Sequence, residues 1–156
     1  MKPFLRYIKS FILSFLLMIF SITTFAQVNE LNELRDASKS AVQWLNYVNS
    51  NSFIEAWNGL SMDAQKYLGK DDWIIAMSRE MENMGDFISR KETYREFNSQ
   101  MDDMPDGYYA IFEYSSNYKS TEDHTEALLL HQDDKRKWRV IGFQYDYKGG
   151  RDTPED

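Results

Sequence analysis

Three stretches in the C-terminal third of the chain alternate aromatic or β-branched residues with smaller or polar ones, and they constrain the fold most strongly. They span residues 108–114, 125–132 and 138–147. The turn sequence Pro105-Asp106-Gly107 precedes the first stretch, and the charged residues 133–137 separate the second from the third. This pattern predicts three antiparallel strands in meander order. Because a three-stranded sheet cannot bury its own apolar face, another part of the chain must cover it.

The residues upstream of this sheet predict three helices. Over residues 28–49, apolar residues recur at gaps of three and four, as on one face of an amphipathic helix. A second helix is predicted over about residues 53–68, and Gly59 and Ser61 inside it are residues that can divide it in two. Acidic residues favour the start of a third helix, over residues 70–84, which a glycine then ends.

Residues 87–97 change to a period of two, which predicts a long, half-exposed strand before the meander. Helices therefore come first in the chain and strands follow. This order is typical of α+β proteins. We expect N-terminal helices packed on one face of a curved antiparallel sheet of about four strands.

The first 26 residues have the parts of a secretory signal peptide. Three basic residues give a positively charged start, residues 11–22 are almost entirely apolar, and Thr24-Phe25-Ala26 places small residues before a cleavage point. The apolar run is shorter than the roughly 20 residues of a membrane span. We therefore expect cleavage near Ala26 and a periplasmic or secreted protein without a stable membrane span. An uncleaved N-terminal anchor is the alternative.

The remainder is expected to form a single α+β domain over residues 27–148, followed by a flexible tail over residues 149–156. Residues 1–26 carry three positive charges and no negative ones, so their removal changes the net charge from −7 to −10. This acidic balance argues against a nucleic-acid partner, because phosphate binding requires clustered lysine and arginine. The chain has no cysteine, so no disulfide stabilises it.

Several motifs follow one another in the expected domain. They are Ala41-x-x-Trp44-Leu45, Phe53-x-x-Ala56-Trp57, Trp73, Gly85, Arg90, Pro105-Asp106-Gly107-x-Tyr109, Glu126 and Trp138-Arg139-Val140-x-Gly142-Phe143. Together they resemble the bacterial domain-of-unknown-function family 4019, from about residue 37 to residue 144. The resemblance implies an exported protein with a cone-shaped fold similar to nuclear transport factor two-like and cystatin-like proteins. It implies no activity, because none is established for the family.

The residues do not predict nucleophilic or metal-dependent catalysis. A nucleophile needs a neighbouring base, but the chain lacks cysteine, and its two histidines, His124 and His131, follow no strand-to-helix nucleophile elbow. We interpret both histidines as surface residues. Two histidines without paired carboxylates do not predict zinc, and Met104 stands where a calcium loop over residues 102–113 needs an oxygen ligand. No catalytic residue, metal or cofactor is therefore predicted.

Two charged residues fall inside predicted strands. Strict alternation places Arg90 on the same face as Ile88 and Tyr94, and Glu126 on an apolar face. A charge on an apolar face is costly unless it is paired or faces water in a cavity. We favour a structural ion pair or two independent charges at the rim of the sheet. The alternative is a small hydrolase or isomerase that uses Glu126 together with Arg90, with the carboxylate as general acid or base inside the cavity that the resemblance implies.

Aromatic residues are numerous, and the four tryptophans occupy positions that predict core packing. If both faces of the sheet are aromatic, one face is left over after the helices dock, as a ligand pocket or a dimer interface. We therefore expect a non-enzymatic module that binds a small apolar or aromatic ligand, or a second copy of itself. The candidate ligand-binding residues are Arg90, Glu126, Trp57 and Tyr109. A role in holding envelope proteins together is a further alternative.

Overall fold

The structure is a computed structural model that describes residues 29–146. The predicted signal peptide and the predicted tail both lie outside the described residues. The chain divides into two compact units, with the boundary between Arg35 and Asp36. The sheet and the short helices belong to the second unit, and so does the first helix from residue 36 onward.

Four helices precede the sheet in the described part of the chain. The first covers residues 29–49, and α2 (Phe53–Asn58), α3 (Met62–Tyr67) and α4 (Lys70–Met84) follow it. The predicted division of the second helix is confirmed, because the chain leaves α2 at Gly59 and enters α3 after Ser61. Between them, the Gly59 carbonyl accepts a hydrogen bond from the Val140 amide at 3.1 Å, and the Ser61 amide donates to the Val140 carbonyl at 2.9 Å.

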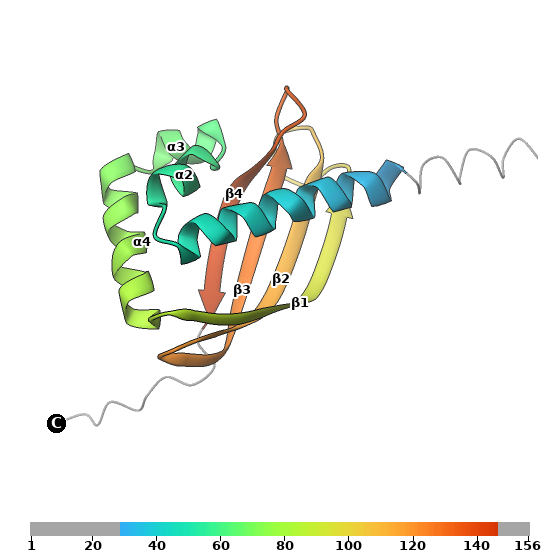
Figure 1. Ribbon diagram of the computed structural model, residues 1–156. Coiled ribbons are helices and arrows are strands. Elements are labelled where there is room, and N and C mark those ends of the chain that lie inside the picture. The colour runs from blue at the N-terminus through green and yellow to red at the C-terminus, as the bar shows by residue number, and fades with distance from the viewer. Residues whose placement is uncertain (1–28, 147–156) are drawn as a thin grey trace, which may run out of the picture. The chain divides into compact units, whose positions relative to one another are not determined.

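The sheet has four antiparallel strands in the order β1-β2-β3-β4 (Figure 1). The strands are β1 (Phe87–Asn98), β2 (Tyr109–Tyr118), β3 (Thr121–Gln132) and β4 (Trp138–Asp146). The predicted meander and the strand before it are confirmed. Strands β2 and β3 are longer than predicted, since pairing continues to Tyr118 and Thr121 across a two-residue turn.

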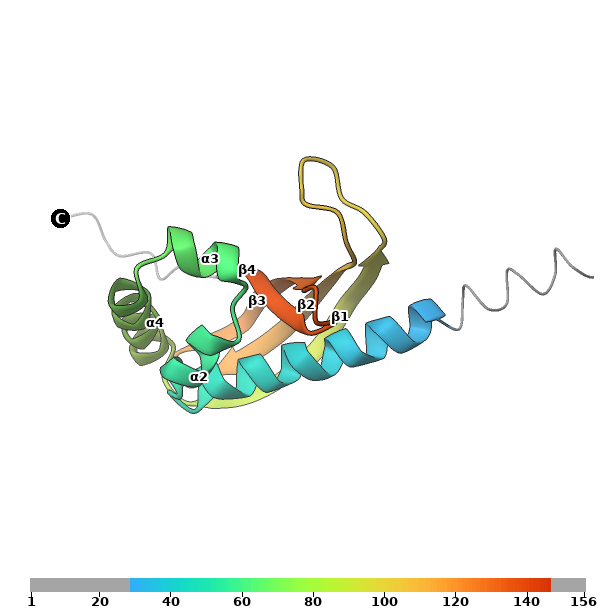
Figure 2. The ribbon, with the colours of Figure 1, turned by 90° about the horizontal axis from the view of Figure 1, so that it is seen from above.

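The first helix, from residue 36 onward, lies across one face of the sheet and packs its apolar side against it (Figures 1 and 2). Every second residue of β2 and β3 is buried on this face, from Ala110 to Tyr118 and from His124 to Leu130. The indole of Trp44 anchors the helix, because its N–H donates to the Ala56 carbonyl at 2.8 Å and its ring lies edge-on to Phe143. The α+β prediction is thus confirmed, whereas the cone-shaped likeness stays a prediction.

The described part of the sheet does not have two aromatic faces. Gly142 pairs with Leu129, and a register shift beside this pair turns Phe143 and Tyr145 toward the helix-covered side, opposite Leu128 and Glu126. The opposite face of β2 carries the buried Tyr109, followed by Ile111, Glu113, Ser115 and Asn117. Most aromatic side chains of the sheet are therefore buried or half-buried, and the few exposed ones, such as Tyr94, form no continuous aromatic face.

The face predicted for Arg90 is wrong. Two extra residues, Ile88 and Thr93, interrupt the pairing of β1 with β2, and each such bulge reverses the alternation of the side chains. Arg90 lies opposite Ser116 and points into the core, whereas the side chains of Ile88 and Tyr94 are 64% and 44% exposed. Alternation alone could not locate these bulges.

Candidate functional site

A buried carboxylate and a guanidinium meet under the first helix. Glu126 on β3 is fully buried, and the side chain of Arg90 on β1 is only 10% exposed. Oxygen Oε2 of Glu126 accepts hydrogen bonds from Arg90 Nε at 2.5 Å and from Ser116 Oγ at 2.7 Å. Oxygen Oε1 accepts from Arg90 Nη2 at 2.9 Å and from the Tyr118 hydroxyl. The guanidinium therefore donates hydrogen bonds to both carboxylate oxygens. Bidentate arginine–carboxylate pairs of this kind are among the strong hydrogen-bonded ion pairs.

The end of the first helix closes this cluster. The side-chain oxygen of Asn49 lies 3.4 Å from Arg90 Nη2 and 3.2 Å from the Tyr118 hydroxyl. The guanidinium carbon of Arg90 also lies 4.8 Å from the centre of the Phe87 ring, in cation–π geometry. The cluster of Asn49, Arg90, Ser116, Tyr118 and Glu126 thus ties the helix to strands β1, β2 and β3.

The surroundings of Glu126 favour its charged form. Burial alone would raise its pKa, but the hydrogen bonds and charge of Arg90, together with the hydroxyls of Tyr118 and Ser116, outweigh burial and lower the pKa. Burial and the nearby Glu126 charge raise the pKa of Tyr118 well above its ordinary value, so its hydroxyl stays protonated. Glu126 is therefore an anion held by three donor side chains, and no exposed carboxylate oxygen is left for a substrate.

His124 is a core residue that was not predicted from the sequence. The interpretation of this histidine as a surface residue is wrong, because it is fully buried and stacks on Tyr145, with ring centres 5.7 Å apart. Tyr118 lies edge-on to it at 5.9 Å. Burial lowers the pKa of His124. The missed signal was its position two residues before Glu126, which places both on the same face of β3.

The other two candidate ligand-binding residues lie apart from this cluster. Trp57 is 7% exposed and packs on Trp73, with ring centres 5.7 Å apart. Tyr109 is fully buried on the opposite face of the sheet, where it stacks on His131 and its hydroxyl donates to the Pro105 carbonyl. The structure therefore brings together Arg90 and Glu126, but neither Trp57 nor Tyr109 joins them.

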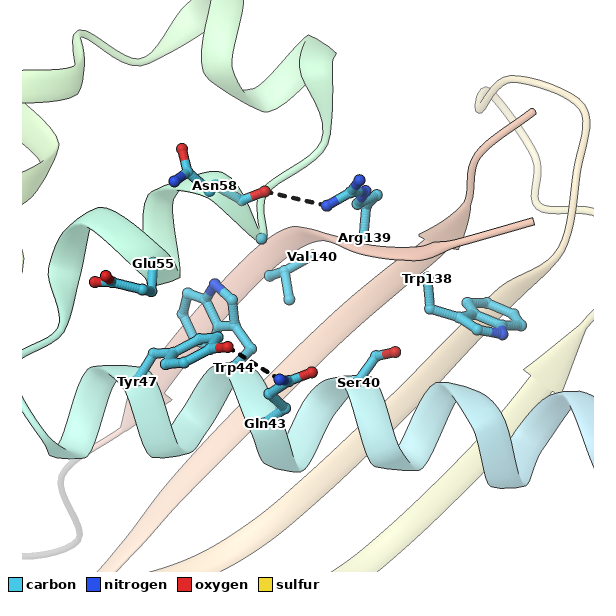
Figure 3. Close-up of a pocket in the computed structure, with 10 residues that line it drawn as sticks. Ser40, Gln43, Trp44, Tyr47, Glu55, Asn58, Trp138, Arg139 and Val140 are labelled. Carbon is cyan, nitrogen blue, oxygen red and sulfur yellow. Dashed lines mark hydrogen bonds between the residues drawn. The ribbon is translucent and has the colours of Figure 1, made fainter. Parts of the chain in front are cut away.

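A pocket that sequence reasoning missed opens between the first helix, α2 and β4 (Figure 3). Its volume is about 280 Å³. We call it the β4 pocket, and its lining residues are Ser40, Gln43, Trp44, Tyr47, Glu55, Asn58, Gly59, Trp138, Arg139 and Val140. The Trp138-Arg139-Val140 motif was a partial signal for it. Ser40, Gln43 and Tyr47 gave none, since polar and amphipathic side chains of this kind are common on the solvent-facing side of a helix, and Trp44 indicated only core packing.

Two hydrogen bonds hold the rim of the β4 pocket. Gln43 Nε2 donates to the Tyr47 hydroxyl at 2.9 Å, and Arg139 Nη1 donates to the Asn58 carbonyl at 3.1 Å (Figure 3). Asp133 also accepts from Arg139 Nε at 3.2 Å, which fixes the guanidinium from behind. Polar groups therefore surround the aromatic rings of the pocket in set positions.

A second hollow, of about 450 Å³, lies between α3 and the turn that joins β3 to β4. Its lining includes the carboxylates of Asp63, Asp106, Asp133 and Asp134. Asp63 forms an ion pair with Lys66 at 2.8 Å, and Asp133 is held by Arg139 and by backbone amides. Among the described residues, no group of three or more side chains is arranged to hold a metal ion.

A comparison with known protein families identifies the family to which the chain belongs. The model of the family described as "Protein of unknown function (DUF4019)" matches residues 40–143. The chain belongs to this family. No curated protein and no solved structure matches it. The matched range of this DUF4019 domain includes both the Glu126 cluster and the β4 pocket. Over residues 29–146, no helix is long and apolar enough to cross a membrane.

Replacing Arg90 with methionine is expected to destabilise the DUF4019 domain by about 3–5 kcal/mol, because it leaves the Glu126 carboxylate buried without its cation. The measurement is urea unfolding of both proteins. Arg95→Met is the matched control, since the ion pair of Arg95 with Glu92 is 49% and 26% exposed at its two side chains and should contribute at most about 1 kcal/mol. Equal losses in the two variants would contradict a special role for the buried pair.

The pH dependence of stability provides a separate check. The pKa of Glu126 is lower in the folded chain than its ordinary value of 4.5, so the unfolded chain takes up more protons as the pH falls. The contribution of Glu126 is therefore complete above pH 4.5 and is lost as the pH falls toward the folded-state pKa.

His124 also contributes stability that is lost as the pH falls. Its pKa is lowered in the folded chain from the ordinary value of 6.5, so the unfolded chain takes up the proton first. The difference in unfolding free energy between the wild type and Glu126→Gln isolates the Glu126 part. This difference should shrink below pH 4.5. A difference that stays constant through the acidic range would show that Glu126 is not charged in the folded protein.

Proposed function

We propose that this DUF4019 domain is a non-enzymatic module that binds a small ligand in the β4 pocket. The main observation that supports this proposal is the composition of the pocket lining. The lining combines the aromatic residues Trp44, Tyr47 and Trp138 with amide, carboxylate and guanidinium groups. Binding sites for small molecules typically combine apolar and aromatic walls with a few fixed polar groups.

The size of the β4 pocket supports a ligand of one or two rings. Its volume of about 280 Å³ lies just below the range of roughly 300–1,000 Å³ that is typical of small-molecule sites. The half-buried Tyr47 ring offers a flat apolar surface for stacking, and the buried indoles of Trp44 and Trp138 form the apolar wall behind it. The Arg139 guanidinium and the Gln43 and Asn58 amides offer hydrogen bonds at the rim. The ligand class is therefore a small aromatic compound with a polar substituent.

The Glu126 cluster supports binding over catalysis. A general acid or base must come within hydrogen-bond reach of its substrate. Glu126 is fully buried, and Arg90, Ser116 and Tyr118 occupy its oxygens. The hydrolase or isomerase alternative therefore loses the open carboxylate on which it was based.

A fragment screen tests ligand binding at the β4 pocket. Benzoate, benzamide, indole and indole-carboxylate are suitable probes, with ligand-detected NMR and tryptophan fluorescence as readouts. At least one probe should bind the wild type, and Ser40→Trp should weaken it at least about tenfold by filling the pocket from the helix side. Asn46→Trp is the control, because Asn46 is exposed on the same helix and does not line the pocket. Failure of every probe, or equal binding to both variants, would overturn the proposal.

We also propose that the domain works outside the cytoplasm. Support comes from the basic, apolar and small-residue parts of residues 1–26 and from the absence of cysteine. Expression of the full chain in a bacterial host, followed by intact mass measurement of the protein from the periplasm or medium, should give a species that begins at Gln27. Recovery of only the full-length chain from the cell interior would contradict export.

A further inference from the structure

The two border strands of the sheet differ in what covers their free edges. On β4, the segment from Gly59 to Ser61 bonds to Val140 through both its amide and its carbonyl. Strand β1 is the other border, and no strand of the described residues pairs with its outer edge (Figure 1). It is 12 residues long and mostly exposed. An open edge of this length presents a row of backbone donors and acceptors that a further strand can use.

The charges along β1 are complementary to those of a second, antiparallel copy of the same strand. The central segment is Lys91-Glu92-Thr93-Tyr94-Arg95-Glu96. If two copies run antiparallel about a point between Thr93 and Tyr94, Lys91 of one copy lies opposite Glu96 of the other. Glu92 then lies opposite Arg95. Opposite charges directly across an antiparallel pair are stabilising, whereas like charges are destabilising.

Because of the bulge at Thr93, the two residues of each charge pair lie on the same face of the sheet. Strict alternation would place Lys91 and Glu96 on opposite faces, and no direct pair would form. Because Thr93 is the extra residue, Lys91 and Glu96 lie opposite Ser115 and Ile111 of β2, on the face away from the first helix. The same shift places Glu92 and Arg95 together on the helix side, where they form an ion pair. Each charge therefore meets its opposite on its own face.

We propose that a second copy of this chain docks along β1, so that two four-stranded sheets join into one continuous sheet through a two-fold axis near Thr93. In such a symmetric interface every contact occurs twice, so each residue pair counts double. Four charge pairs then line the seam. The Tyr94 side chain, 44% exposed in the single chain, lies next to the axis and becomes covered.

The charges on β1 differ from the usual protection of a sheet edge. Exposed edges commonly carry lysines, which repel a second edge of the same kind. Here each positive residue meets a negative one in the reversed copy, so the pattern favours self-pairing in a single register. Because one strand pair buries less area than a standard protein interface, the dimer is expected to be weak and concentration-dependent.

Sedimentation velocity over a concentration series, on the protein without residues 1–26, tests this surface. The wild type should show a monomer–dimer equilibrium. Lys91→Glu should raise the dissociation constant at least about tenfold, since it turns two attractive pairs into repulsive ones. The charge swap Lys91→Glu with Glu96→Lys should restore the wild-type constant, because each pair is attractive again.

Lys70→Glu is the control, because Lys70 is an exposed lysine at the start of α4 and lies outside the proposed seam. It should leave the dissociation constant unchanged. Circular dichroism establishes that all variants fold, as expected because Lys70 and Lys91 are exposed and Glu96 is only half-buried. A wild type that stays monomeric at every concentration would overturn the proposal. So would a dimer that Lys91→Glu leaves intact, or one that the charge swap does not restore.

Discussion

The arrangement of the sheet depends on the buried Glu126 carboxylate. A fully buried anion is costly unless a cation and hydrogen-bond donors lie within reach of its oxygens. Arg90 meets that requirement from a strand two places away in the sheet, and Asn49 adds the end of the first helix. Such a pair contributes little net stability relative to an apolar core, since desolvation offsets most of the attraction. The pair also depends on the register of β1, because Arg90 reaches Glu126 from the position opposite Ser116.

Irregular pairing in β1 is what lets Arg90 take this position. Two extra residues reverse the side-chain alternation twice within 12 residues. The first reversal turns Arg90 inward beside the ring of Phe87, and the second leaves Tyr94 outside. A regular strand with this sequence would expose Arg90 to water and leave the carboxylate of Glu126 buried without a cation. The bulges are thus part of how the core is neutralised.

The elements were predictable to the extent that they follow a simple period. Helical spacing located residues 29–49 and α4, and alternation located the four strands within a few residues. The division at Gly59 was also predictable, because glycine inside a helix marks a weak point. By contrast, the faces of Arg90, Phe143 and Tyr145 depend on bulges, which come from pairing between distant segments and leave no local signature.

The candidate site was predictable only in part, for a related reason. Arg90 and Glu126 stood out because charges inside strands need partners, and the structure joins them. His124 did not stand out, since a polar turn and the start of a long strand look alike in sequence. The β4 pocket draws its lining from three separate segments, so its shape depends on how the first helix crosses β4. No single stretch of sequence encodes that crossing.

The bridge from Gly59 and Ser61 to Val140 has a further consequence for how copies of this sheet can assemble. It occupies the backbone of Val140, near the start of β4, so an incoming chain cannot pair at this position without first displacing the segment between α2 and α3. The β4 border therefore offers a shorter run of free backbone groups to a further strand than the β1 border does. Edge-to-edge growth of this sheet is thus favoured at one border over the other.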